Sequence, residues 1–276
     1  MSLLLPNQLT VTLSIDSVAV IHQSRGLRSR ILQQQHIAVV PSEERAVWLQ
    51  ATRALESALA AMQIKPKTTM QIIVANDFVR YLMLPWQPIS MSPAEQYAYA
   101  VAAYREVYGA VADGWGIKLH DAPPNQARLV AAIDENLLAT LQQISLKHQI
   151  KLASVQPNLM RTYNGLRKQV GKLNGHLVIV EPRRLLLLSM LKGQCQNLRT
   201  MSINATFDDD WQLELKNLLA RESLLDEVTG NEVLVYAPAE KNTKLNAIEG
   251  WNIRRVVQVD KKLAADKPFA LLGATT

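Results

Sequence analysis

The feature that most constrains the fold is an order of predicted elements that occurs twice along the 276 residues. Three strands, a helix and a buried strand follow one another as β-β-β-α-β, judged from apolar periodicity and turn residues. The first copy is predicted at residues 9–15, 18–21, 31–40, 43–62 and 69–75. The second is predicted at residues 176–180, 185–192, 195–203, 208–223 and 232–236, with a last strand at 252–259. Repeated supersecondary order restricts topology more than any single element, so the chain is predicted to form two similar α/β lobes.

A segment of different character lies between the two copies. A strand at residues 78–84 stops at Pro85, and Ser92-Pro93-Ala94-Glu95 combines a capping box with proline at the first helical position. We therefore predict a helix from there to Tyr108, with Gly109 as its C-cap. Further elements are predicted as strands at 117–120 and 128–133, a helix at 135–147 and a strand at 151–155. The order β-α-β-β-α-β predicts a small inserted ferredoxin-like lobe, followed by a helix at 158–172.

The composition is that of a protein with a large core. With 48% hydrophobic and 20% charged residues, the chain is not expected to be disordered. The net charge is +6, but the basic residues are scattered and the 5% aromatic residues do not interleave with them, so specific nucleic-acid binding is not expected. An ordinary solvated basic surface, or a basic face against an anionic inner-membrane surface, remains open. The apolar run Leu185–Leu191 is too short to span a bilayer and the N-terminus lacks a signal-peptide pattern, which predicts a soluble protein.

The sequence contains no recognisable metal or catalytic motif. Cys195 is the single cysteine, which excludes an intrachain disulfide and favours a small buried hydrophobe. No two histidines have the i, i+4 spacing of a zinc site, and Asp208-Asp209-Asp210 is typical of a helix N-terminus. Phosphate-binding glycine loops and a Gly-x-Ser-x-Gly elbow are absent. We therefore predict no metal and no catalytic residue, although a serine, histidine and aspartate brought together in space stay open.

The element order resembles that of the actin-like ATPase superfamily, in which two βββαβ lobes carry a small lobe inserted in the first. The position of the insertion is similar to that in the bacterial pilus assembly protein PilM and the cytoplasmic part of the type II secretion protein GspL. The segments that carry this resemblance are 74–86 with the capped helix after it, 152–157 and 269–273. It implies a first lobe at 1–77 and 158–172, an inserted lobe at 78–157 and a second lobe at 173–276.

The resemblance also indicates where a nucleotide would bind. The family holds phosphates with two glycine-bearing turns, each opened by a metal-organising aspartate, and holds adenosine with paired glycines. This chain has Asp16-Ser17, Glu181-Pro182 and Ala237-Pro238 at these three places. Missing glycines and two prolines remove close backbone N–H donors, so ATP binding and hydrolysis are not expected. Asp16 stays open as a turn residue or a metal-organising carboxylate, whereas Glu181 is interpreted as a solvated turn acid.

The resemblance implies a catalytically silent scaffold in the cytoplasm, peripheral to the inner membrane. Its implied partner is a membrane-embedded assembly protein with a short cytoplasmic segment, and an active Mg-ATP-binding ATPase or sugar-kinase-like phosphotransferase is the alternative. The candidate docking residues are the tryptophans Trp86 and Trp115, which lie beside turn formers, and the cations Arg80 and Arg128, which could pair with an acidic peptide or an acidic lipid surface. The competing interpretation is that both tryptophans fill the seam between the inserted and first lobes.

Overall fold

The computed structural model describes residues 7–24, 30–40, 46–203, 210–224, 230–240 and 244–257. The chain divides into two compact units. One contains the described residues up to Val79 together with Ile133–Thr162, and the other contains Arg80–Ala132 together with the described residues from Tyr163 onward. The acidic cap at Asp208 and Asp209 and the C-terminal motif 269–273 lie outside the described residues.

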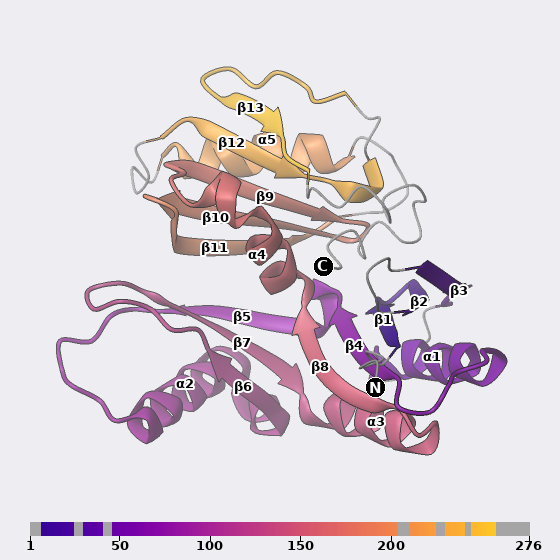
Figure 1. Ribbon diagram of the computed structural model, residues 1–276. Helices are drawn as coiled ribbons and strands as arrows, with labels where there is room; N and C mark the ends of the chain where they lie inside the picture. Colours follow the sequence, from indigo (N-terminus) through magenta and orange to yellow (C-terminus); the bar gives the residue numbers. More distant parts are fainter. Residues whose placement is uncertain are drawn as a thin grey trace, which may run out of the picture. The chain divides into compact units, whose positions relative to one another are not determined.

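A five-stranded mixed sheet forms the centre of the first unit, in the order β3-β2-β1-β4-β8 (Figure 1). Three strands are antiparallel neighbours, and β4 and β8 continue the sheet parallel to β1. The strands are β1 (Gln8–Leu13), β2 (Ser17–Ser24), β3 (Arg30–Ala38), β4 (Thr69–Val74) and β8 (Lys151–Pro157). The predicted order of three antiparallel strands, a crossover helix and a parallel strand is therefore confirmed.

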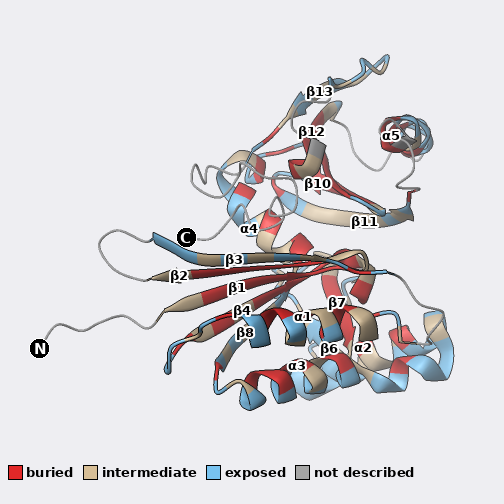
Figure 2. Cartoon of the chain, turned by 90° about the vertical axis from the view of Figure 1, so that its right-hand side faces the viewer, coloured by how far each residue is buried: buried red, intermediate tan, exposed pale blue. Residues whose placement is uncertain are grey.

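Two helices, α1 (Leu49–Ala61) and α3 (Glu135–Lys147), cover one face of this sheet (Figure 2). Buried side chains of α1 such as Leu55 and Leu59 lie against the apolar strands, as helical spacing predicts. Among described residues α1 begins at Leu49, later than the predicted 43, because residues 46–48 form a turn. Trp48 in that turn is 8% exposed, and its Nε1 donates a hydrogen bond to Asp134 Oδ2 at 3.0 Å.

The second sheet repeats the first in the order β11-β10-β9-β12-β13. Its first three strands are antiparallel neighbours, and β12 and β13 follow parallel to β9. The strands are β9 (Gly175–Glu181), β10 (Arg184–Leu191), β11 (Gln194–Ser202), β12 (Glu232–Tyr236) and β13 (Asn252–Arg255). Helix α5 (Asp210–Glu222) packs on one face through Trp211, Leu215 and Leu219. The matching strand orders confirm the duplication inferred from the sequence.

Polar side chains are buried at one end of the face that α5 covers. Glu222, the last residue of α5, pairs with Arg199 and accepts a hydrogen bond from Ser189 Oγ at 3.3 Å. The same hydroxyl lies 3.3 Å from Nδ1 of His176, whose ring meets Trp251 edge-on at 5.1 Å between centroids. Ser189 thus lies between histidine and glutamate, and the cluster is buried, unlike a hydrolytic triad in which histidine is central. Its role is to join α5 to the sheet through satisfied hydrogen bonds.

Acidification is expected to destabilise the protein through two buried histidines. Burial lowers the pKa of His176 against a smaller opposing effect of Glu222, and burial followed by the charge of Lys65 lowers the pKa of His22. A histidine in the unfolded chain titrates near pH ~6.5, so below that pH the unfolded state binds more protons and the free energy of unfolding falls. Above this pH, the two histidines are neutral in both states, and their contribution to the free energy of unfolding is complete. Urea midpoints measured between pH values of about 7.5 and 5.5 should decrease toward the acid end.

Replacing His22 by leucine should reduce this acid sensitivity. His22 is 2% exposed, and neither of its ring nitrogens has a hydrogen-bond partner among the described residues. Leucine removes a buried polar ring that must remain neutral. The exposed His120, replaced by glutamine, is the control for the loss of a histidine side chain at the surface. A urea midpoint independent of pH, or unaltered pH dependence in His22→Leu, would contradict the argument.

The inserted segment contains a three-stranded sheet in the order β5-β7-β6 with α2 packed on it (Figure 1). Its elements are β5 (Val79–Leu84), α2 (Pro93–Tyr108), β6 (Trp115–Leu119) and β7 (Arg128–Asp134), with short 3-10 turns at 76–78 and 109–114. The predicted capping box at Ser92 and Glu95 and the C-cap at Gly109 are both confirmed. Tyr104 of α2 is fully buried, and its hydroxyl lies 2.8 Å and 2.9 Å from the carbonyls of Arg80 and Val130.

The sheet of the inserted segment differs from the predicted ferredoxin-like order in its last strand. β8 pairs with β4 of the first sheet, parallel and with a register shift between Met70 and Gln71, and α3 contacts α1 and β8. β8 thereby occupies the position that β13 holds in the second sheet. The inserted sheet therefore has three strands, because its last predicted α-β pair completes the duplicated fold. The predicted lobe boundaries stay a prediction.

Candidate functional site

The first predicted nucleotide turn, between β1 and β2, is closed by its own side chains. The hydroxyls of Ser14 and Ser17 both donate to Asp16 Oδ1, at 2.5 Å and 3.1 Å. The Ser14 N–H donates to the Ser17 carbonyl at 2.9 Å, and the Val39 N–H donates to the Asp16 carbonyl at 2.7 Å. Of the two interpretations of Asp16, this network favours the strand-end turn residue, since the carboxylate already accepts two local hydrogen bonds.

The second predicted nucleotide turn joins β9 to β10. Glu181 pairs with Arg184 across the two-residue turn Pro182-Arg183. Glu181 is 2% exposed, so its interpretation as a solvated turn acid is wrong, and the reason is that β9 is buried along its whole length. Its carboxylate also raises the pKa of Tyr81, after the larger effect of burial. Pro182 is exposed and has no N–H to donate to a phosphate.

The third predicted turn follows β12 at Ala237 and Pro238. Ala237 is 3% exposed, and its carbonyl accepts a hydrogen bond from Arg255 Nη1 at 3.2 Å. Pro238 opens the short 3-10 helix η3 (Pro238–Glu240) and is buried. The Ala237 carbonyl is thus engaged by the protein itself, and Pro238 has no N–H to donate.

The described part of the chain gives little support for metal binding or for a reactive thiol. It contains no group of three or more histidine, cysteine, aspartate or glutamate side chains placed to hold a metal ion. Burial raises the pKa of Cys195 to about 12, which leaves the thiol protonated and unreactive at neutral pH. Of the helices described, none is both long and apolar enough to cross a membrane.

The structure separates the four residues predicted to contact a partner. Trp86 and Arg128 line one pocket, and Trp86 is 44% exposed. Trp115 instead begins β6 and packs on the core of the inserted sheet, with its ring edge-on to those of Tyr104 and Tyr108 at 6.1 Å and 5.1 Å. Arg80 lies on β5 and is not among the residues that line the pocket. The geometry therefore joins two of the four candidates, and their role in binding stays a prediction.

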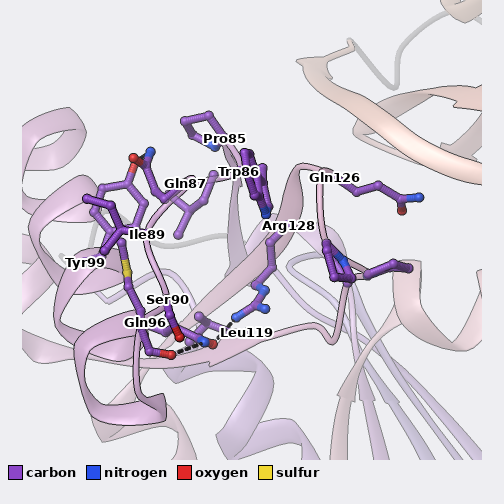
Figure 3. A pocket seen from close by; sticks show the side chains of 15 residues that line it. Pro85, Trp86, Gln87, Ile89, Ser90, Gln96, Tyr99, Leu119, Gln126 and Arg128 are labelled. Carbon is purple, nitrogen blue, oxygen red and sulfur yellow. Dashed lines mark hydrogen bonds between the residues drawn. The ribbon is translucent and has the colours of Figure 1, made fainter.

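The pocket has a volume of about 260 Å³ and belongs wholly to the inserted segment. Figure 3 shows Arg128 extending toward Gln96 of α2, with the indole of Trp86 above it in this view. The walls come from the β5–α2 loop, the first turns of α2, the end of β6 and the loop before β7. The lining residues are Leu84, Pro85, Trp86, Gln87, Ile89, Ser90, Met91, Gln96, Tyr99, Leu119, Ala122, Pro123, Pro124, Gln126 and Arg128.

Hydrogen bonds and prolines hold the β5–α2 loop in place. Gln87 Nε2 donates to the Tyr99 hydroxyl at 3.1 Å, and Gln96 Nε2 donates to the Met91 carbonyl at 2.9 Å. Proline at 85 and 88 restricts the backbone between these contacts. Because the loop is tied to α2 on both sides, the walls of the pocket are formed without a ligand.

Apart from Trp86 and Arg128, the lining residues of this pocket were missed by reasoning from the sequence, and three of them illustrate why. Gln96 and Tyr99 are three positions apart on α2 and so lie on neighbouring turns of one face, and Ile89 in the loop is 70% exposed. A sequence signal for Ile89 is the largely apolar and proline-rich segment 84–89, which continues past the strand into a loop, whereas Gln96 and Tyr99 lie outside that segment.

No family model matches the chain, and no curated protein matches it significantly. Solved structures do resemble it over most of its length. The cytoplasmic domain of EpsL, an inner-membrane component of the type II secretion system of Vibrio cholerae, has a TM-score of 0.57 at 12% identity, with 96% of this chain and 92% of that chain covered. The PilM–PilN type IV pilus biogenesis complex gives 0.61 at 11% identity, with 98% and 99% covered.

A third solved structure is also similar to the chain. It is a Bacteroides thetaiotaomicron protein with an actin-like ATPase fold, with a TM-score of 0.52 at 12% identity and with 84% of this chain and 82% of that chain covered. Identities this low are informative about the fold alone. Together with the duplicated sheets, they show that the chain has the actin-like ATPase fold.

Proposed function

We propose that the chain is a catalytically silent scaffold at the cytoplasmic face of the inner membrane, where it docks a membrane-embedded component of a pilus or secretion-like assembly machine. The observation that carries the proposal is the likeness, nearly complete in both directions, to a cytoplasmic domain of a secretion component and to a pilus biogenesis complex. Coverage of this extent means that the inserted segment is matched along with the two duplicated sheets.

The local structure of the three nucleotide turns supports the catalytic silence. Asp16 accepts hydrogen bonds from its own turn, Pro182 occupies the second turn, and Ala237 and Pro238 occupy the third. Phosphate binding in such turns requires free backbone N–H groups that approach the ligand closely. The pocket at Trp86 and Arg128 supports a docking role, since aromatic and arginine side chains dominate binding energies at protein interfaces.

Photo-crosslinking in the native cell tests the docking role. A tagged chain should sediment with the membrane fraction and crosslink to a protein that has a membrane helix and a short cytoplasmic segment, identified by mass spectrometry. The exposed Arg105 site on α2, outside the pocket, provides the position for the control crosslinker. A chain that remains in the soluble fraction and crosslinks to no membrane protein would refute the scaffold.

Magnesium-ATP is expected to leave the melting temperature unchanged. A ligand at a hundred times its dissociation constant stabilises a protein by about 2.7 kcal/mol, which a thermal-shift measurement detects easily. Phosphate release should likewise equal that of a buffer blank, because the turns lack the donors that hydrolysis needs. Turnover that Asp16→Ala abolishes would contradict the prediction and favour the alternative, an active ATPase or sugar-kinase-like phosphotransferase.

A further inference from the structure

The pocket of the inserted segment combines apolar and neutral polar side chains with a single charge. Its walls include Trp86, Ile89, Leu119 and two consecutive prolines, and Arg128 is the one charged residue among the fifteen that line it. All fifteen lie within the described range 46–203. Arg128 is partly buried, and an arginine that is partly withdrawn from water is commonly paired with an anion.

Arg128 has no acidic partner within the described chain. Its Nη1 donates to Gln96 Oε1, a neutral acceptor, and the ion pairs recorded among described residues involve other arginines and lysines. Arg105 on α2 differs from Arg128, because its guanidinium pairs with the carboxylate of Asp113 at 2.8 Å. A guanidinium has several N–H donors in a planar fork that matches a carboxylate, so one bond to an amide leaves donors available.

The guanidinium is also held in position. Gln96, which accepts from Arg128, has its own Nε2 bonded to the Met91 carbonyl at 2.9 Å (Figure 3). A chain of hydrogen bonds therefore runs from the β5–α2 loop through α2 to β7. Fixing the arginine before binding reduces the entropy lost when an anion arrives.

We propose that this pocket binds a short peptide segment in which an aspartate or glutamate lies next to a large apolar side chain. The carboxylate pairs with Arg128, and the apolar side chain packs against Trp86 and the prolines. The volume of about 260 Å³ lies below the ~300–1,000 Å³ typical of small-molecule sites, which suits one or two side chains better than a cofactor. A lipid surface would be recognised by several cations, and this pocket has one.

The inference rests on the proposed function, because it assigns this acidic segment to the cytoplasmic part of the membrane partner. It adds the chemistry of the segment and the residues that recognise it. The loop that carries Trp86 is already tied to α2, so we expect binding without rearrangement of the pocket.

Selection from a phage-displayed library of random dodecapeptides tests the proposal, with the purified full-length chain as bait. The wild-type protein should enrich peptides with an acidic residue beside an aromatic or aliphatic one. The affinity of the leading peptide, measured by fluorescence anisotropy, should fall about tenfold or more in Arg128→Gln and in Trp86→Ala, since a charged hydrogen-bonded pair contributes ~1.5–3 kcal/mol. Arg128→Lys should retain part of the affinity, and Arg105→Gln should retain all of it.

A second measurement uses the peptide itself. Changing its acidic residue to the matching amide should weaken binding to the wild type, and should have little further effect on Arg128→Gln, as a double-mutant cycle requires. Circular dichroism melts establish that each variant is folded. Failure to enrich any peptide, enrichment without acidic residues, or equal affinity for wild type and Arg128→Gln would overturn the proposal. Arg128-dependent binding to phosphatidylglycerol vesicles in place of peptides would also overturn it.

The outcomes separate this inference from the scaffold on which it rests. If Arg128→Gln still crosslinks to the membrane partner as the wild type does, the pocket assignment is wrong and the scaffold stands. If acidic peptides are selected but no membrane protein is crosslinked, the pocket assignment stands and the scaffold is wrong.

Discussion

Alanine at position 193 is expected to lower the free energy of unfolding by more than about 3 kcal/mol. Gly193 has a φ of +76°, and a Cβ added there would lie 2.2 Å from the carbonyl oxygen of Gly171. This neighbour is backbone and cannot rotate aside. The Gly193 N–H donates to the Leu173 carbonyl at 2.9 Å, and its carbonyl accepts from the Tyr163 hydroxyl at 2.9 Å. The substitution would therefore disrupt the contacts between the β10–β11 turn and the residues that follow α4 (Asn158–Val170).

Gly250→Ala is the matched control for this substitution. Its φ of +81° is similar, but among the described residues no atom beyond Gly250 and its two chain neighbours lies within 4 Å of an added Cβ. It should show only the cost of the left-handed conformation, about 1–2 kcal/mol. Urea unfolding followed by circular dichroism measures both variants. Equal losses would show that the clash with Gly171 contributes nothing, contrary to the geometry.

Trp115→Ala should lower the free energy of unfolding by about 3 kcal/mol, while Trp86→Ala should lower it by less than about 1 kcal/mol. Trp115 packs on the buried cluster of the inserted sheet and meets Tyr104 and Tyr108 edge-on. Removing the indole leaves a cavity beside Tyr104, which is fully buried. Trp86 is 44% exposed at the rim of the pocket and loses little by truncation.

The same urea experiment distinguishes the two tryptophans. A similar loss of unfolding free energy in both variants would show that Trp86 is a core residue. Trp86 would then not belong to the proposed docking surface. A small loss in Trp86→Ala together with a loss of peptide affinity is the expected result. The tyrosine pair provides an internal check, because Tyr108→Ala should weaken the ring cluster without altering the pocket.

Local chemistry allowed much of the fold to be predicted. In α2, Ser92 and Glu95 bond reciprocally at 3.3 Å and 2.7 Å, and Gly109 takes a φ of 72° that side chains disfavour. Strands such as β12 and helices such as α3 begin and end at the predicted residues. These signals act within a few residues, so they can be interpreted without knowing the rest of the structure.

The assignment of β8 to a sheet could not be made in this way. The strand itself was predicted, but its partner β4 is separated from it by the whole inserted segment. A strand pairs with whichever sheet edge is available in the folded chain, and that edge can belong to residues far away in the sequence. The apolar periodicity of the strand carries no information about this partner. The candidate pocket is a similar case, because Trp86 and Arg128 come from different elements and meet through α2.

By itself, the sequence determined the duplicated element order and the ends of helices such as α2 and α3, because turns, caps and apolar periods are local properties of the chain. Only the tertiary structure decided that Glu181 is buried, that Trp115 belongs to the core, and that Arg128 faces a neutral partner in the pocket. The physical reason is that burial and charge pairing are set by side chains far away in sequence, whose positions exist only once the sheets have formed.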